Sequence, residues 1–221
     1  MLVKEILNTE IAPLRLSDSV SLALTKMDLM NSTKYGVIDN EKNLVGMATL
    51  EHLIEVADEQ TPLSEVELAE PLYIPVNQHL FEAARLMLAH ELLVLPVINE
   101  SFGYEGIVKR REVLNALGNL FNLSTYGSVI TVEVSQKNFT LTEMVHIIET
   151  EGAKILSVAV RQPTAENPFY SISFKLNLKD SSVVSAGLRR FGYTVTSEAQ
   201  SESFEMNFSD RADELIRYLD I

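Results

Sequence analysis

The sequence predicts a mixed α/β fold, in which a duplicated α/β unit precedes a separate βαββαβ domain. Two observations carry this prediction. First, residues 44–53 (LVGMATLEHL) return about sixty positions later as residues 105–114 (EGIVKRREVL). In both copies a short apolar strand reaches a glycine, turns through polar residues and enters a helix. Second, the apolar pattern changes after residue 127, where β-branched strands alternate with amphipathic helices.

The duplication extends over most of the first 120 residues. Each copy is expected to run strand, helix, strand, strand, helix. The helices are predicted at residues 18–30 and 79–89, the following strands at 35–38 and 92–98, and the turns after them at 40–43 and 99–104. The first repeat is expected to span residues 1–57 and the second 58–120. The matching positions are Val20/Leu80, Ala23/Ala83, Met27/Met87, Val37/Val97, Ile38/Ile98 and Gly46/Gly106.

A domain boundary is predicted within residues 118–128, which carry turn-forming residues without a clear period. The next domain is expected over residues 127–200. Its strands are predicted at 128–134, 155–160, 169–176 and 193–196, and its helices at 140–151 and 180–191, where Val183 is expected to point inward. Residues 197–205 are expected to form a mobile tail. A final amphipathic helix, packing on its own domain or on a partner, is predicted within residues 209–220.

Composition excludes several functions. The 221 residues carry a net charge of −13, which disfavours nucleic acid and anionic membrane surfaces as partners. No cysteine is present, so disulfides, thiolate metal sites and cysteine nucleophiles are excluded. The N-terminal sequence is unlike a signal peptide, and no apolar run is long enough for a membrane helix. We therefore expect a cytoplasmic protein.

The repeated unit of about sixty residues, its strand ends VID and PVIN, and the G-x-x-T turn at Gly46 and Thr49 resemble a pair of CBS domains. The resemblance implies a Bateman-type module with clefts that bind AMP, ADP, ATP or S-adenosylmethionine, and a homodimer that regulates another protein. The βαββαβ order is similar to the ACT domain, a ferredoxin-like module that often senses amino acids. The combination resembles the acetoin-utilisation regulatory (AcuB-like) family.

Within that resemblance, the two turns are the candidate nucleotide sites. The family turn offers a threonine hydroxyl and backbone N–H groups to phosphate at a helix start, and an aspartate to the ribose hydroxyls. The first turn keeps Thr49 but has His52 in place of the aspartate. The second has Lys109 in place of the threonine and Glu112 in place of the aspartate. These departures put the family's adenosine specificity in doubt.

Lys109, Arg110 and Arg111 form the densest basic run of this acidic chain. Because the repeat alignment places them at the cleft, they are candidate phosphate ligands, and the alternative is solvated surface charge. If one ligand binds, we expect it in the cleft of residues 109–112.

Three apolar residues precede the turns and are candidates for the walls of an adenine pocket: Tyr35, Leu95 and Pro96. A plain core role is an equal alternative for them.

In the ACT-like domain, residues 135–139 (SQKNF) occupy the loop in which that family binds its ligand, and Phe139 stands near the expected glycine. Without this glycine the close backbone approach to a small amino acid is lost, so dimerisation is favoured over amino-acid binding.

Enzyme motifs are missing from the sequence. The four histidines lack H-x-x-x-H spacing, which gives no indication of a metal site, and no phosphate-binding glycine loop or nucleophile motif occurs. The sequence thus predicts a non-enzymatic regulator with no required cofactor. The alternative is a ligand-free dimerisation scaffold that keeps both folds, and an enzyme of small-metabolite turnover is a remote third.

Overall fold

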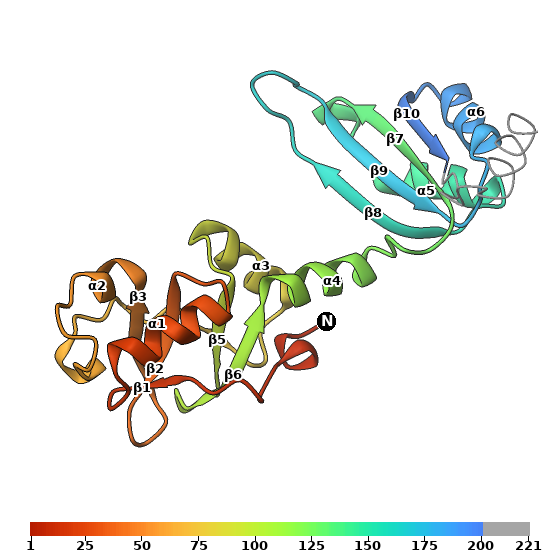
Figure 1. The fold of residues 1–221 in the computed structure, drawn as a ribbon. Helices are drawn as coiled ribbons and strands as arrows, with labels where there is room; N and C mark the ends of the chain where they lie inside the picture. The colour runs from red at the N-terminus through yellow and green to blue at the C-terminus, as the bar shows by residue number, and fades with distance from the viewer. Residues whose placement is uncertain (201–221) are drawn as a thin grey trace, which may run out of the picture. The chain divides into compact units, whose positions relative to one another are not determined.

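The computed structural model describes residues 1–200 and divides the chain into two compact units, Met1–Leu120 and Phe121–Ile221 (Figure 1). The helix predicted within 209–220 lies outside the described residues. Unit 1 contains 3-10 turns at Val3–Ile6 and Leu63–Glu65, β1 (Leu14–Arg15), α1 (Val20–Leu29), β2 (Lys34–Ile38), β3 (Leu44–Thr49), α2 (Leu50–Ile54), β4 (Ile74–Pro75), α3 (Leu80–Ala89), β5 (Val94–Ile98), β6 (Tyr104–Lys109) and α4 (Arg110–Leu120).

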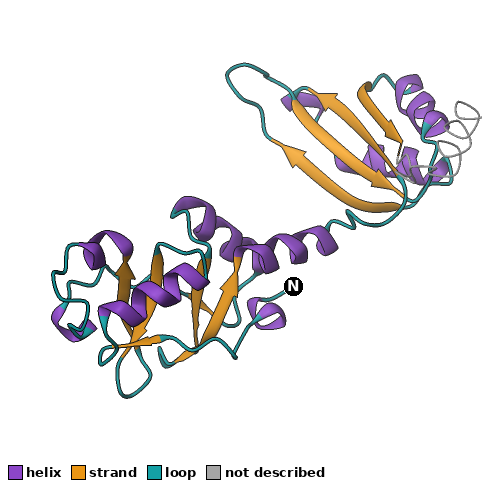
Figure 2. Ribbon diagram, viewed as in Figure 1, coloured by secondary structure: helices purple, strands orange, loops and turns teal. Residues whose placement is uncertain are grey.

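Unit 1 holds two small sheets of the same topology, ordered β1-β2-β3 and β4-β5-β6 (Figure 2). In each sheet the first pair of strands is parallel and the second pair antiparallel. The register also shifts at the same place, because Val37 pairs with Gly46 and Val97 pairs with Gly106 just before the irregularity. The mixed α/β fold with tandem CBS-type repeats that the sequence predicts is therefore confirmed.

The two repeats share their core. Val94 and Ile107 from the second repeat are buried in the same cluster as Leu14 and Val37 from the first. Each repeat thus buries apolar surface of the other at their boundary. A single repeat would leave that surface exposed to water.

Unit 2 contains β7 (Ser128–Val134), a 3-10 turn (Gln136–Asn138), α5 (Leu141–Thr150), β8 (Ile155–Arg161), β9 (Tyr170–Leu176), α6 (Ser182–Arg190) and β10 (Thr194–Gln200). Its strands form one antiparallel sheet in the order β10-β7-β9-β8, which is the ferredoxin-like arrangement.

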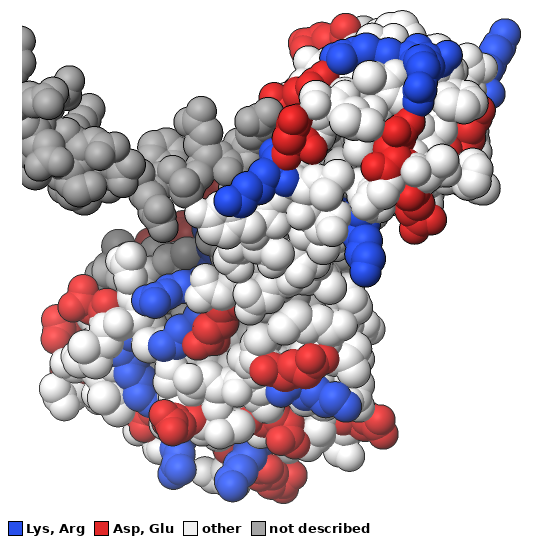
Figure 3. Space-filling view, turned by 90° about the vertical axis from the view of Figure 1, so that its right-hand side faces the viewer, with Lys and Arg blue, Asp and Glu red and all other residues white. Residues whose placement is uncertain are grey.

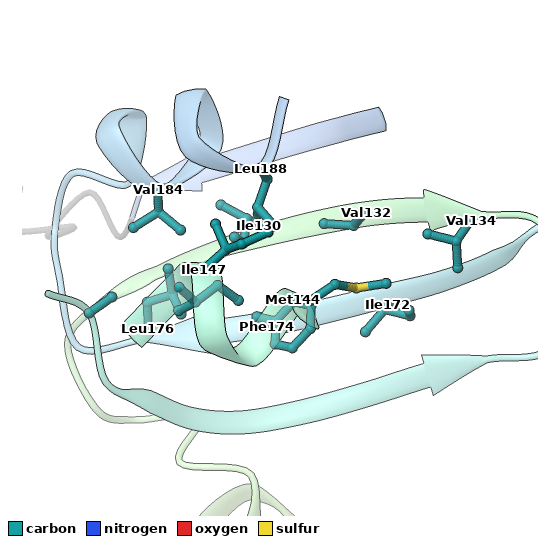
Figure 4. Close-up of a cluster of buried hydrophobic side chains, with 12 residues drawn as sticks. Ile130, Val132, Val134, Met144, Ile147, Ile172, Phe174, Leu176, Val184 and Leu188 are labelled. Atoms are coloured by element: carbon teal, nitrogen blue, oxygen red, sulfur yellow. The ribbon is translucent and has the colours of Figure 1, made fainter. Parts of the chain in front are cut away.

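Alternation along the central strands of unit 2 creates its core. Alternate residues of β7, beginning with Ile130, and of β9, including Phe174, face helices α5 and α6. Figure 4 shows Met144 of α5 and Leu188 of α6 directed into this layer. The helices therefore cover one face of the sheet.

Two local predictions in unit 2 are wrong. The mobile tail predicted at residues 197–205 is wrong for 197–200, because β10 continues to Gln200 and pairs with β7, and residues 201–205 lie outside the described part of the chain. Val183, expected to face inward, is 60% exposed, whereas Val184 is fully buried. The face of helix α6 that packs on the sheet is therefore narrower than the set of its apolar residues, because it excludes Val183.

Candidate functional site

The two glycines of the repeated turns make room for neighbouring backbone. Met47, next to Gly46, pairs with Ala69, and Ile107, next to Gly106, pairs with Asn8. A Cβ atom at Gly106 would lie 2.4 Å from the Asn8 carbonyl oxygen, and φ there is +152°. The glycine is therefore required by packing of the chain on itself, independently of any ligand.

The first turn is closed by its own hydrogen bonds. The Thr49 hydroxyl accepts from the backbone N–H of His52 at 3.3 Å and so caps α2. The His52 Nδ1 atom lies 2.9 Å from the Glu67 carbonyl oxygen. Because a carbonyl only accepts, Nδ1 donates to it, which leaves Nε2 as the ring nitrogen available to another partner.

The second turn separates the basic run into different roles. The Arg110 guanidinium donates to the carbonyl oxygens of Leu92 at 2.9 Å and Met87 at 3.1 Å, at the end of α3. Lys109 and Arg111 form no ion pair within residues 1–200. Arg110 is therefore held by two backbone carbonyls, whereas Lys109 and Arg111 form no ion pair among the described residues.

Glu112 links this turn to a hollow. Its Oε2 atom accepts from the Lys109 backbone N–H at 3.1 Å, which leaves Oε1 for another donor. The hollow has a volume of about 450 Å³ and also contains Asn8, Asn115 and Asn119. The full set of lining residues is Met1, Glu5, Ile6, Leu7, Asn8, Glu112, Asn115, Ala116 and Asn119.

Sequence reasoning missed the asparagines of this hollow. Asn115 and Asn119 follow Glu112 at helical spacing on α4, so a search for a polar stripe on this helix would have found them. Asn8 belongs to a segment distant in sequence and carried no comparable indication.

The residues proposed as adenine walls lie in the core. Tyr35 is 2% exposed and Leu95 is fully buried. The Tyr35 hydroxyl donates to the Ala12 carbonyl oxygen at 3.4 Å, and burial raises the pKa of Tyr35 to about 12. Pro96 packs against β2, where a Cβ atom at Gly36 would lie 2.9 Å from the proline Cγ. Tyr35 and Pro96 thus lie where the two repeats meet, whereas Leu95 belongs to the core of the second repeat.

Unit 2 contains another hollow, of about 510 Å³, beside the loop that follows β7. The Tyr193 hydroxyl donates to the Glu143 carboxylate at its wall, and burial and this carboxylate raise the pKa of Tyr193 to about 12. The ring of Phe139 lies 4.5 Å from that of Tyr170, centroid to centroid. The predicted loop therefore borders a real concavity, although Phe139 itself packs on a neighbouring ring.

Neither a single-sign charge patch on the face shown in Figure 3 nor a cluster of metal ligands is found among the described residues. Figure 3 shows basic and acidic side chains interspersed on the face in view. Within residues 1–200, no three His, Asp or Glu side chains converge to hold a metal ion, and no helix is long and apolar enough to cross a membrane.

Repetition of the strand–turn–helix unit defines a tandem-repeat α/β module. Residues 63–119 match the model of the CBS domain family, so the second repeat is a CBS domain. CBS-domain proteins commonly bind nucleotides such as AMP or ATP in regulatory roles and are typically not catalytic.

Parts of the chain are similar to a curated relative and to solved structures of CBS-domain proteins. The magnesium transporter MgtE of Thermus thermophilus is 36% identical over 81 residues, which are 37% of this chain and 18% of the transporter. This chain thus matches less than a fifth of that relative.

The structure of a CBS domain pair/ACT domain protein from Thermotoga maritima is 24% identical, covering 54% of this chain and 98% of that one, with a TM-score of 0.48. A protein from Vibrio cholerae assigned to acetoin utilization (AcuB) is 21% identical, covering 56% and 95%, with a TM-score of 0.47.

Proposed function

We propose that this protein is a non-enzymatic, cytoplasmic regulator whose CBS pair binds an adenine nucleotide in the hollow beside Glu112. The observation that carries the proposal is that Glu112, the acidic residue of the second turn, lines a polar hollow along α4. In sequence Glu112 follows Lys109 and Arg111, two cations that form no ion pair within residues 1–200. Cations and backbone N–H groups attract phosphate there, and a carboxylate accepts from a diol.

Each residue of the second turn has a distinct role in this proposal. Lys109 and Arg111 contact phosphate, and the free Oε1 atom of Glu112 accepts from a ribose hydroxyl. Arg110 acts indirectly, because its guanidinium fixes the turn to the end of α3. Asn115 and Asn119 offer amide donors and acceptors along the same wall.

Binding would regulate through a shift between subunit arrangements. A ligand can favour one arrangement only if it binds that arrangement more tightly. In our proposal the nucleotide contacts α4 and the segment around Asn8, so binding stabilises the pairing of this segment with β6. The regulated partner then meets a different surface of a homodimer.

Isothermal titration calorimetry of the full chain with AMP, ADP, ATP and S-adenosylmethionine tests the proposal. We expect saturable heat with at least one of the four. No heat with any of them would reject nucleotide sensing by this module.

Variants locate the site. Lys109→Ala combined with Arg111→Ala is expected to weaken binding by at least about tenfold, since two charge-assisted phosphate contacts are lost. Thr49→Ala is expected to have a smaller effect. The opposite ranking would move the site to the first turn. A charge-matched control, Lys137→Ala with Arg161→Ala, changes exposed cations of unit 2 and is expected to bind as the wild type does.

A ligand-free scaffold is the second candidate. It is favoured by the closed first turn, where Thr49 caps a helix and His52 contacts the Glu67 carbonyl. Native mass spectrometry of freshly purified protein separates the two candidates. A co-purifying nucleotide supports the sensor, whereas a dimer without ligand, together with silent calorimetry, supports the scaffold.

We assign a dimerisation role to unit 2, which resembles an ACT domain in its element order. Its sheet has two edge strands, β8 and β10, and an edge strand can pair with a second copy. Light scattering of the full chain with Val160→Lys on β8, which is 41% exposed, tests this role. Loss of the dimer is expected, and an unchanged dimer would assign the contact elsewhere.

A further inference from the structure

The second repeat contains a built-in guanidinium site at the C-terminal end of a helix. Arg110 Nε donates to the Leu92 carbonyl oxygen and Arg110 Nη2 to the Met87 carbonyl oxygen. The last carbonyls of a helix lack partners within the helix, and the helix dipole favours a cation there. Arg110 therefore shows which chemical group fits this end of the repeat.

The first repeat presents the same backbone without the arginine. Leu50 occupies the equivalent position, since its N–H donates to the Thr33 carbonyl oxygen at 2.8 Å, as the Arg110 N–H donates to Leu93 at 2.9 Å. A leucine side chain has no donor to offer the carbonyls beside it.

The helix end of the first repeat is equally well matched. The Ser32 N–H donates to the Met27 carbonyl oxygen at 2.8 Å, and in the second repeat the Leu92 N–H donates to Met87 at 3.0 Å. Asn31 and Glu91 both adopt a left-handed backbone, with φ of 49° and 55°. The carbonyls of Met27 and Ser32 thus lie where Arg110 finds its acceptors in the other copy.

A hollow of about 190 Å³ is present at this place in the first repeat. Its lining residues are Leu24, Met27, Asp28, Asn31, Ser32, Thr33 and Leu50. Asp28 adds a carboxylate where the second repeat has Leu88, and it forms no ion pair within residues 1–200. The lining is therefore rich in acceptors and contains no cation.

We propose that this hollow binds the guanidinium group of a small molecule of the arginine class. A planar guanidinium offers several N–H donors in a fixed fork, so it can reach both backbone carbonyls and still donate to Asp28. A compact ammonium offers no comparable fork. The group enters from solvent in the first repeat, whereas Arg110 supplies it from within the chain in the second.

Titration of the full, isotope-labelled chain with L-arginine, followed by amide NMR, tests the proposal. Saturable shifts are expected at Asn31, Ser32, Thr33 and Leu50, and much smaller ones with L-lysine. Equal responses to both amino acids, or no response at these amides, would overturn the proposal.

Two variants assign the shifts to the hollow. Leu50→Arg introduces the internal guanidinium of the second repeat and is expected to reduce arginine affinity at least tenfold. Its matched control is Ile54→Arg, at a 68% exposed position of the same helix outside the lining, with affinity unchanged. Asp28→Leu, at an exposed position, installs the second repeat's residue and is expected to weaken binding several-fold even if Leu50→Arg fails to fold.

The source of the guanidinium is tested separately by sedimentation velocity. If an arginine of a second copy fills the hollow, Leu50→Arg dissociates the oligomer and free arginine competes with assembly. That result would overturn the small-molecule proposal, whereas an unchanged sedimentation coefficient alongside lost arginine binding supports it. Because the nucleotide titrations address another hollow, their failure would leave this outcome unaffected.

Discussion

A single methyl group at Gly106 is expected to disturb the second repeat. The added Cβ would lie 2.4 Å from the Asn8 carbonyl oxygen, in a backbone conformation with φ of +152°. Gly106→Ala should therefore lower the free energy of unfolding by about 2 kcal/mol or more. Urea unfolding followed by circular dichroism measures this loss.

The matched control is Gly152→Ala, where φ is +84° but no atom lies within 4 Å of the added Cβ. Only backbone strain opposes the substitution there, so we expect the free energy of unfolding to fall by about 1 kcal/mol. Equal costs at both positions would show that the contact with Asn8 has no energetic weight.

Asp39 gives the hairpin of the first repeat a dependence on pH. Hydrogen bonds from the backbone N–H groups of Asn43 and Glu41 lower the Asp39 pKa below its ordinary value of 3.8. Its carboxylate thus contributes stability above that value, and the contribution is lost as pH falls through the lower folded pKa. Asn99 makes the corresponding contacts in the second repeat without a charge.

Asp39→Asn is therefore expected to flatten the acid limb of the stability curve. The difference in Tm between wild type and variant should shrink as pH falls from 6 to about 3. The reason is that Asp39 is protonated over this range, whereas an asparagine at position 39 does not titrate. Thermal melts in matched buffers measure this difference. A constant difference across that range would contradict the assigned role.

At individual residues, sequence comparison between the repeats placed Thr49, His52, Lys109 and Glu112 at equivalent turns, which the structure reproduces. It could not foresee that Arg110 contacts the end of α3, because that contact depends on where the helix ends in space. Local alignment therefore located the turns but not the partners of their side chains.

Helix α1 depends on its N-cap. The Ser19 hydroxyl accepts from the Leu22 N–H at 3.3 Å, which satisfies one donor of the first turn. Ser19→Ala should cost about 1 kcal/mol, whereas Ser19→Asp should retain the cap. Ser21→Ala removes a hydroxyl two residues further along and should be close to neutral. Chemical denaturation measures the free energy of unfolding of the three variants. Equal losses in Ser19→Ala and Ser21→Ala would contradict a stabilising role for the Ser19 cap.

At the level of elements, periodicity predicted most strands and helices within a few residues, because burial of one face imposes it. The extension of β10 escaped prediction. Its residues after Thr196 are polar apart from Ala199, yet they pair through the backbone with β7 at an edge of the sheet. Pairing of an edge strand depends on backbone hydrogen bonds more than on hydrophobic side chains. The sequence pattern therefore indicates such a strand only weakly.

Across the whole molecule, each compact unit has its own core and is expected to unfold separately. Phe174→Ala should lower only the transition of unit 2, and Leu95→Ala only that of unit 1, by about 3 kcal/mol each, because both side chains are fully buried. Differential scanning calorimetry resolves the two transitions. A single transition shifted by both variants would mean that the units unfold together.

The duplication made the architecture of unit 1 predictable, since the same pattern of residues occurs twice and each copy supports the other. The hollows were not predictable in the same way. They arise where one copy departs from the other, as at Leu50, or where a distant segment such as Asn8 closes a wall.

The antiparallel bridge between Asn8 and Ile107 has a consequence for synthesis in the cell. A ribosome releases Asn8 roughly a hundred residues before the strand that pairs with it, so this backbone stays without its partner during elongation. The edge strand β6 of the second sheet can pair with the segment around Asn8 only after both repeats have left the ribosome. Translation pauses within residues 60–107 would therefore prolong exposure of an unfinished sheet, and chaperone capture should be strongest in that interval.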